Sequence, residues 1–243
     1  MLLLGIDTSG KSGGVTLAEG DEHHFRVLES TPIAGGTFSA QLVPTIAAVL
    51  EKHGLAASDV GGFAVASGPG SFTGLRVGLS GVKGLAEVLG APIATVSVLE
   101  ALASFSKRPG RVAAALDAGR SEVYFGLYHV GPSAITGISE NLVTQIEYLQ
   151  ELNDHQLDAA VTSDSALAGL AYEHCVVVPA LVERPGSEDV ARLGLRKLLA
   201  GQTVSVEALD ANYLRRSDAE LFSLPHPMNQ PSKDPQSKKD GQR

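Results

Sequence analysis

The sequence carries the same local pattern twice. An apolar, strand-like run ends in Asp7, and a second such run ends in Asp117 in the other half of the chain. Each aspartate is followed by the small residues of a turn and then by another apolar run, over residues 14–18 and 123–129. An aspartate after a strand is by itself a common turn residue. Its recurrence in matching surroundings predicts a chain built from two units of one design.

Hydrophobic periodicity predicts the order β-β-β-α-β-α-β-α in both units. In the first unit we expect strands near residues 2–6, 14–18, 24–29, 63–66 and 93–96, and helices near 39–53, 74–89 and 99–105. In the second unit we expect strands near 112–116, 123–129, 134–138, 159–162 and 176–178, and helices near 144–152, 167–172 and 188–199. Ser187 is the expected N-cap of the last helix.

Two such units, each headed by a strand, an aspartate and a turn, resemble the actin/hexokinase/Hsp70 (ASKHA) superfamily, a duplicated α/β fold. The resemblance implies that the two aspartate-bearing turns face each other across a cleft, where kinases and ATPases of this class position a metal and phosphates. We expect an N-terminal ASKHA-like subdomain at 1–108 and a C-terminal one at 109–216. We expect residues 217–243 to be a disordered polar tail, because they contain too few apolar residues to form a core.

Composition excludes several classes of function. The chain has 243 residues and a net charge of −8, which argues against a large basic surface for nucleic acid. Cys175 is the single cysteine, so an internal disulfide is excluded and a reducing cytoplasm is the expected location. The short apolar run at the N-terminus lacks a basic region and indicates a strand rather than a signal peptide. No apolar run is long enough for a membrane span.

Residues 67–78, Ser-Gly-Pro-Gly-Ser-Phe-Thr-Gly-Leu-Arg-Val-Gly, join a predicted strand to a predicted helix. Glycines at such a turn allow positive φ angles, and the free N–H groups of a helix start can hold an anion. The segment lacks the Gly-Lys-Ser/Thr ending of a P-loop, and Thr73 stands where G-x-G-x-x-G needs its last glycine. Ser71 and Thr73 are therefore expected to cap the helix. Arg76 is expected to pair with a carboxylate across an interface, and anion binding or a solvated side chain are the alternatives.

Several motifs together are similar to the TsaB/YeaZ family, partner subunits in bacterial synthesis of threonylcarbamoyladenosine beside the tRNA anticodon. They lie in the family's order at residues 7–9, 68–78, 83–86, 96–103, 117–118, 122–124 and 213–215. The family's catalytic paralogue, TsaD, carries a His-x-x-x-His pair that can ligate a metal. The matching positions here are Val98 and Leu102. The resemblance thus implies a non-catalytic scaffold and activator without a metal or cofactor of its own.

In this family two helices form the surface that pairs with TsaD or with a second copy. The resemblance implies such an interface here at Leu42, Ile46, Val49, Gly74, Leu75, Arg76, Gly78, Leu79, Gly81 and Val82. The second helix also contains Gly84. Each mid-helix glycine costs about 0.5–1 kcal/mol relative to alanine, so this glycine face favours the close approach of a partner. The apolar side chains serve equally well in the chain's own core.

The resemblance further implies a heterodimer with TsaD, a ternary complex with the ATPase TsaE, and contact with tRNA only through that complex. A homodimer is the alternative when the chain is alone. Nucleotide and metal are expected in the partner complex, and the residues that would face a nucleotide are Asp7, Thr8, Gly70, Ser71 and Asp117. Departures from the family at Phe38, Gly119 and Ala211 weaken the nucleotide inference.

Two other hypotheses about the function remain. The first is an ATP-dependent phosphotransferase or ATPase of the ASKHA superfamily that uses Asp7 and Asp117, although a glycine-rich adenosine loop is missing from the second half. The second is a peptidase, for which the sequence offers no Ser-His-Asp, Cys-His or zinc-ligand pattern.

Overall fold

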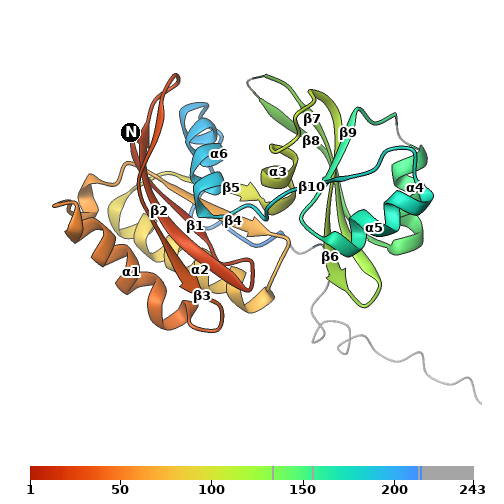
Figure 1. Ribbon diagram of the computed structural model, residues 1–243. Coiled ribbons are helices and arrows are strands. Elements are labelled where there is room, and N and C mark those ends of the chain that lie inside the picture. The colour runs from red at the N-terminus through yellow and green to blue at the C-terminus, as the bar shows by residue number, and fades with distance from the viewer. Residues whose placement is uncertain (133, 155, 213, 215–243) are drawn as a thin grey trace, which may run out of the picture.

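The computed structural model describes residues 1–132, 134–154, 156–212 and 214, and contains two five-stranded sheets (Figure 1). The strands of the first sheet are β1 (Leu2–Asp7), β2 (Ser12–Gly20), β3 (Phe25–Ala34), β4 (Phe63–Gly68) and β5 (Ile93–Ser97). Those of the second are β6 (Gly110–Gly119), β7 (Glu122–Val130), β8 (Ile135–Thr144), β9 (Ala159–Thr162) and β10 (Ala180–Leu181). The helices are α1 (Phe38–Lys52), α2 (Phe72–Leu89), α3 (Val98–Ala103), α4 (Gln145–Asp154), α5 (Ser165–His174) and α6 (Ser187–Leu199), with a short 3-10 turn, η1 (Ala57–Asp59).

The two sheets repeat one topology. The strand order is β3-β2-β1-β4-β5 in the first sheet and β8-β7-β6-β9-β10 in the second. In both, the first strand pairs antiparallel with the second and parallel with the fourth, and the fourth pairs parallel with the fifth. The predicted β-β-β-α-β-α-β-α order is therefore confirmed twice, and the chain has the expected duplicated α/β fold of the ASKHA type.

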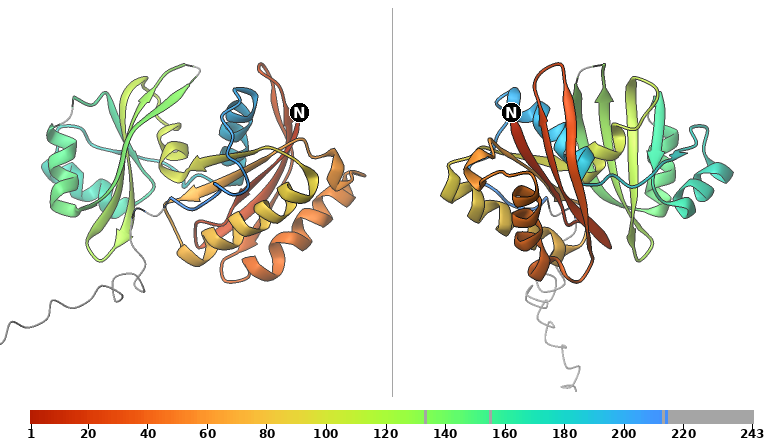
Figure 2. Two further views of the ribbon diagram at one scale, coloured as in Figure 1. Left: turned by 180° about the vertical axis from the view of Figure 1, so that it is seen from behind. Right: turned by 60° about the vertical axis from the view of Figure 1, so that its left-hand side comes forward.

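Helices separate and flank the two sheets (Figure 2). Helices α1 and α2 cover the outer face of the first sheet, and α4 and α5 cover the outer face of the second. Helix α6 lies on the inner face of the first sheet, and α3 contacts strands of both sheets. Strand residues alternate between the layers, since Leu3 faces the central core and Leu4 the core beneath α1 and α2.

Three predicted details are wrong. Thr73 lies within α2 and does not cap it, because Ser71 occupies the N-cap. Residues 176–178 form no strand, because Cys175 N donates to Ala171 O at the end of α5 and Val176 N donates to Asn153 Oδ1. The edge strand β10 follows at Ala180–Leu181. Gly186, not Ser187, occupies the N-cap of α6, where its N–H donates to Asp189 Oδ2.

The end of the described chain returns to the first sheet. Helix α6 packs against β1 and β4, although it follows the second sheet in sequence, and Leu209 joins the core beneath α1 and α2. The division at residues 108 and 109 stays a prediction. The predicted tail, 217–243, lies outside the described residues. No described helix combines the length and the apolar character that crossing a membrane requires.

Candidate functional site

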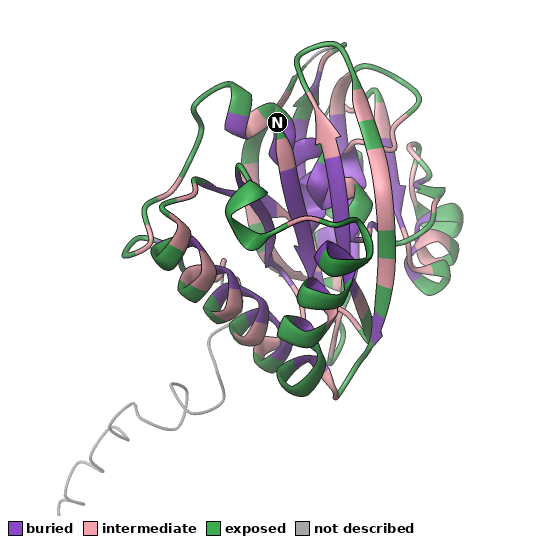
Figure 3. Cartoon of the chain, turned by 90° about the vertical axis from the view of Figure 1, so that its left-hand side faces the viewer, coloured by how far each residue is buried: buried purple, intermediate pink, exposed green. Residues whose placement is uncertain are grey.

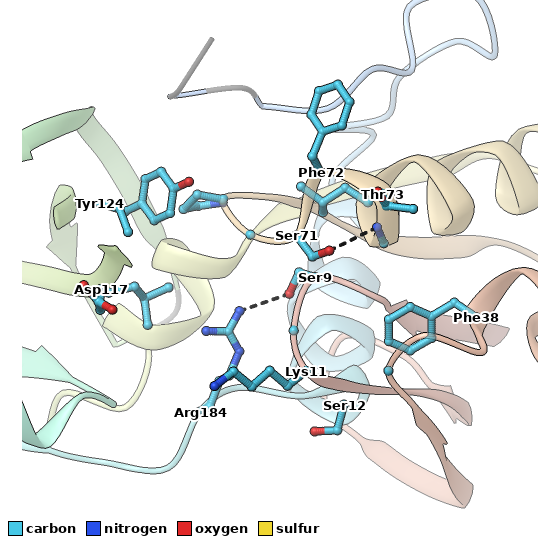
Figure 4. A pocket seen from close by; sticks show the side chains of 18 of the residues that line it. Ser9, Lys11, Ser12, Phe38, Ser71, Phe72, Thr73, Asp117, Tyr124 and Arg184 are labelled. Atoms are coloured by element: carbon cyan, nitrogen blue, oxygen red, sulfur yellow. Dashed lines mark hydrogen bonds between the residues drawn. The ribbon is translucent and has the colours of Figure 1, made fainter. Parts of the chain in front are cut away.

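A cleft of about 1210 Å³ opens between the two units (Figure 4). The turn after β1 and the turn after β6 both line it, as the duplicated design predicts. On the first wall lie Ser9, Lys11 and the residues that open α2, and on the opposite wall lie Asp117 and Tyr124. The cleft therefore lies between the two turns, as the resemblance to the ASKHA superfamily implied, and its chemistry depends on the groups that reach it.

Asp7 does not line this cleft. Its residue is 3 % exposed, and its Oδ1 accepts a hydrogen bond from Ser9 N at 2.8 Å. Burial raises the pKa of the Asp7 carboxyl, while the hydrogen bonds from Ser9 and the nearby Arg184 guanidinium oppose the rise. The carboxylate holds the turn after β1 in shape, and it is covered by that turn rather than open to a ligand.

Thr8 is also buried, contrary to the prediction that it faces a nucleotide. Its Oγ1 donates to Gly74 O at 2.7 Å, so the hydroxyl fastens the turn after β1 to the first turn of α2. Gly70, Ser71 and Asp117 do line the cleft. Ser71 Oγ accepts from Gly74 N at 3.3 Å, which confirms Ser71 as the N-cap of α2, and Asp117 Oδ1 accepts from Gly119 N at 2.9 Å.

Sequence reasoning missed Arg184. This residue follows β10 in the second half of the chain, yet its guanidinium donates from Nη2 to Ser9 Oγ at 3.3 Å and lines the cleft. Figure 4 shows it beside Ser9 and Lys11. A single arginine in a loop has no spacing signal, so only the fold reveals that it stands over the turn that contains Asp7.

The predicted interface residues lie mostly inside the chain. Leu42, Ile46, Val49, Leu75, Leu79 and Val82 belong to the core between the first sheet and the helices α1 and α2, each no more than 6 % exposed. These side chains were expected either at a partner interface or in the chain's own core, and the structure places them in the core. They support the helix pair from beneath rather than forming its outer surface.

The glycines of α2 make close approaches, but to this chain's own atoms. A Cβ at Gly74 would lie 2.1 Å from Thr8 O, one at Gly78 would lie 2.3 Å from Thr8 Oγ1, and one at Gly81 would lie 2.9 Å from Leu42 Cδ2. We predicted that these three glycines allow a partner to approach closely. In the structure they instead allow Thr8 and Leu42 of the same chain to do so. Gly84 differs, because it is exposed and a Cβ there would meet nothing within 4 Å.

The outer surface of the helix pair carries small and apolar residues among charged and polar ones such as Glu51, Arg76 and Glu87. On α1 the exposed residues include Ala40, Val43, Pro44 and Ala47, and Val43 is 54 % exposed. On α2 they include Ser80, Gly84 and Val88, and Val88 is 84 % exposed. In Figure 3 the side of the molecule that carries these helices faces the viewer, with exposed residues along the outer helix surface. Arg76, also exposed, places its guanidinium 3.8 Å from the centroid of the Phe72 ring.

Comparison with known proteins decides the family. The family model described as "TsaD: tRNA N6-adenosine threonylcarbamoyltransferase" matches residues 32–210. The chain is 30% identical over 230 residues to the tRNA threonylcarbamoyladenosine biosynthesis protein TsaB of Escherichia coli, an alignment that covers 90% of this chain and 96% of that protein. The chain belongs to the TsaB/YeaZ family. The TsaB protein of Bacillus subtilis is 28% identical over 237 residues, covering 90% of this chain and 96% of that protein.

A solved YeaZ structure from Pseudomonas aeruginosa agrees with this membership. It superposes with a TM-score of 0.71 at 28% identity and covers 88% of this chain and 99% of that one. A TsaD-type protein is also similar in sequence. The tRNA N6-adenosine threonylcarbamoyltransferase of Sorangium cellulosum is 30% identical over 200 residues, which span 74% of this chain and 55% of that protein.

In this TsaB-family chain the two positions that were predicted to match the paralogue's histidine pair are apolar and internal. Val98 and Leu102 lie on α3 and are 2 % and 0 % exposed. Within the residues described, no three His, Cys, Asp or Glu side chains gather closely enough to hold a metal ion. The motif at residues 213–215 has only Leu214 among the described residues, and that side chain lines the cleft.

Proposed function

We propose that this chain is a non-catalytic scaffold and activator subunit that pairs with the catalytic subunit TsaD. The complex transfers a threonylcarbamoyl group to N6 of the tRNA adenosine beside the anticodon, with TsaE as an ATPase partner and with tRNA contacted through the complex. Membership of a family whose curated members are tRNA threonylcarbamoyladenosine biosynthesis proteins supports the pathway. Nucleotide and metal belong to the complex in this proposal.

The observation that carries the pairing is the outer surface of α1 and α2. Ala40, Val43 and Ala47 on α1, with Gly84 and Val88 on α2, present short side chains to solvent. Short side chains let helices of a partner approach closely and bury apolar area. The buried leucines beneath keep this surface in place without taking part in it.

Two sites favour a supporting role over catalysis. Val98 and Leu102 have no donor atoms for a metal, and the Asp7 carboxylate is enclosed by the turn that it stabilises. Phosphoryl transfer needs charged groups that reach the ligand. Of the two aspartates named for the phosphotransferase alternative, Asp117 alone lines the cleft.

The test combines the purified chain with TsaD from the same organism. Light scattering after size exclusion reports the mass of the complex, and mass spectrometry of digested tRNA reports threonylcarbamoyladenosine. We expect a one-to-one complex, and modification only when both subunits are present. No association, together with no effect on modification, would overturn the proposal. Stoichiometric ATP turnover by the pure chain would favour the phosphotransferase alternative instead.

A matched pair of variants locates the surface. Gly84→Arg places a long side chain on the outer face of α2, where a Cβ meets nothing within 4 Å, so the free chain is expected to fold. Gly169→Arg makes the same change on α5, where a Cβ again meets nothing within 4 Å. We expect G84R to abolish pairing and G169R to preserve it. Pairing that survives G84R would place the interface elsewhere.

Gly78→Arg, on the same helix, does not serve this purpose. An arginine there would push into Thr8, which lies under the helix, and would disturb the monomer itself. Loss of pairing in that variant would not distinguish a blocked surface from a damaged fold.

A further inference from the structure

The carboxylate of Glu140 joins the two halves of the molecule. Glu140 lies on β8 of the second sheet, and its Oε1 accepts a hydrogen bond from Tyr128 Oη on the neighbouring β7 at 2.5 Å. Its other oxygen, Oε2, accepts from Nδ2 of Asn212 at 2.6 Å. Both oxygens of one side chain are thereby engaged, one by its own sheet and one by the returning end of the chain.

Asn212 is in turn attached to the first sheet. Its backbone N–H donates to Ser67 O on β4 at 2.8 Å. The segment before it is anchored as well, because Val204 pairs with Ile93 of β5 and Leu209 is buried in the core beneath α1 and α2. The segment 204–212, here called the strap, is therefore attached to the first sheet. The side-chain amide of Asn212 connects the strap to the second sheet through Glu140.

Tyr128 makes the joint rigid on the other side. Its side chain is among the largest that are fully buried, and it belongs to the central core that both sheets share. Burial, with the Glu140 carboxylate as the next cause, raises the pKa of the Tyr128 hydroxyl, so the hydroxyl stays protonated and donates at any physiological pH. Glu140 consequently holds one orientation toward Asn212.

Apart from this joint and the hydrogen bond from Arg184 Nη2 to Ser9 Oγ, the described contact between the sheets is formed mainly by an apolar core. Around α3 the shared core contains residues of both sheets, for example Val96 and Ala114. Apolar burial has no preferred direction, and packed elements can slide or rotate slightly without losing it. A hydrogen bond weakens steeply when its distance or angle changes. The polar joint thus adds a directional constraint on the angle between the sheets to the constraint that the packed core imposes.

We propose that the Asn212–Glu140 hydrogen bond is a latch that fixes the angle between the two sheets and, with it, the width of the cleft. Asn212 itself lines that cleft, so the latch stands where any opening motion would act. Glu140 and Tyr128 are positioning residues in this scheme. The latch belongs to the free chain and does not depend on the proposed partner function.

The chemistry of the joint allows a rescue test. Asn212→Asp sets a carboxylate against the Glu140 carboxylate and removes the donor. Adding Glu140→Gln restores a bond of reversed polarity, because the glutamine amide donates to the carboxylate introduced at position 212 while its oxygen still accepts from Tyr128. A merely structural role for either residue alone predicts no such recovery.

The readout is the distance between the two units in the full chain. Fluorescent labels are attached at Glu51→Cys on α1 and Glu173→Cys on α5, both exposed, in a Cys175→Ser background. We expect single-molecule energy transfer to shift to longer or broader distances in N212D and to return to the unmutated distribution in N212D/E140Q. Glu147→Gln, which alters a hydrogen bond within the second unit between Glu147 and Thr144, is the control and leaves the distance unchanged.

Two results would overturn the latch. One is an unchanged distance distribution in folded N212D, as checked by circular dichroism. The other is a double variant that remains as displaced as N212D. Should N212D fail to fold, Asn212→Leu, which removes the donor without adding charge, provides the same comparison, and an unchanged distance in that variant would equally refute the proposal.

Discussion

Thr8 lies against Gly78 so closely that a side chain at position 78 would have no room. A Cβ there would be 2.3 Å from Thr8 Oγ1, and that same hydroxyl donates to Gly74 O one turn earlier. The glycines at the start of α2 therefore allow the helix to rest on the turn after β1. This contact fixes the position of the helix whose outer face carries Gly84 and Val88.

Gly78→Ala should destabilise the chain, whereas Gly84→Ala should not. The methyl group at 78 overlaps the Thr8 hydroxyl, and overpacking of this kind costs about 1–3 kcal/mol. At 84 the methyl group meets no atom, so the helix propensity of alanine stabilises by about 0.5–1 kcal/mol. Urea unfolding of both variants measures the difference. Equal effects at the two sites would contradict the Thr8 contact.

Asp7→Asn is expected to raise the stability of the chain at neutral pH. Burial raises the pKa of the Asp7 carboxyl in the folded state above its value in the unfolded state. Between these two pKa values the folded state binds more protons than the unfolded state, so the stability of the chain falls as pH rises through the folded-state pKa. Asparagine keeps an acceptor for Ser9 N but cannot ionise. The gain in melting temperature should therefore be larger at pH 7 than in acid.

The same variant bears on function. We expect D7N to support tRNA modification by TsaD as well as the unmutated chain does. Loss of modification in a folded, TsaD-binding D7N chain would indicate that the Asp7 charge takes part in chemistry.

Glu29→Gln should weaken the attachment of α1 to β3. Glu29 accepts from Lys52 Nζ and pairs with His53 Nε2 at the end of the helix, both at 2.9 Å. Hydrogen bonds to Lys52, and then to His53, lower the pKa of the Glu29 carboxyl. The resulting stabilisation is present above the pKa that the carboxyl has in the unfolded state. It is lost as pH falls through the lower pKa that the carboxyl has in the folded state. The stability difference between E29Q and the unmutated chain should shrink in acid, and a pH-independent difference would refute the ion pair.

Tyr148→Phe should stabilise the second unit by about 1 kcal/mol, because burial of a hydroxyl without a partner is costly. Tyr148 is 0 % exposed and packs edge-to-face on Phe125, and no described protein group hydrogen bonds to its hydroxyl. Tyr128→Phe is the matched comparison and should destabilise, since it removes the donor to Glu140. The melting temperatures of Y148F and Y128F, compared with that of the unmutated chain, test both expectations. A loss of stability in Y148F would mean that the hydroxyl is hydrogen bonded in solution.

Local pattern predicted the repeated elements well and the site less well. The continuous apolar runs of β1 and β2, which are buried on both faces, and the helical spacing of apolar residues in α1 and α2 can be recognised in the sequence. The same spacing did not tell which face of α2 is covered. Leu75 and Leu79 belong to the core and Gly84 to the surface because the first sheet and Thr8 lie on one side of the helix, and these are brought there by the fold.

The sequence by itself determined the duplicated α/β design and the family, because both depend on residue identity and short-range order. The tertiary structure alone decided that Asp7 is enclosed, that Arg184 reaches Ser9, and that Asn212 holds Glu140. Those contacts join residues far apart in the chain, and their geometry is set by how two sheets and the helices between them pack, which no local pattern encodes.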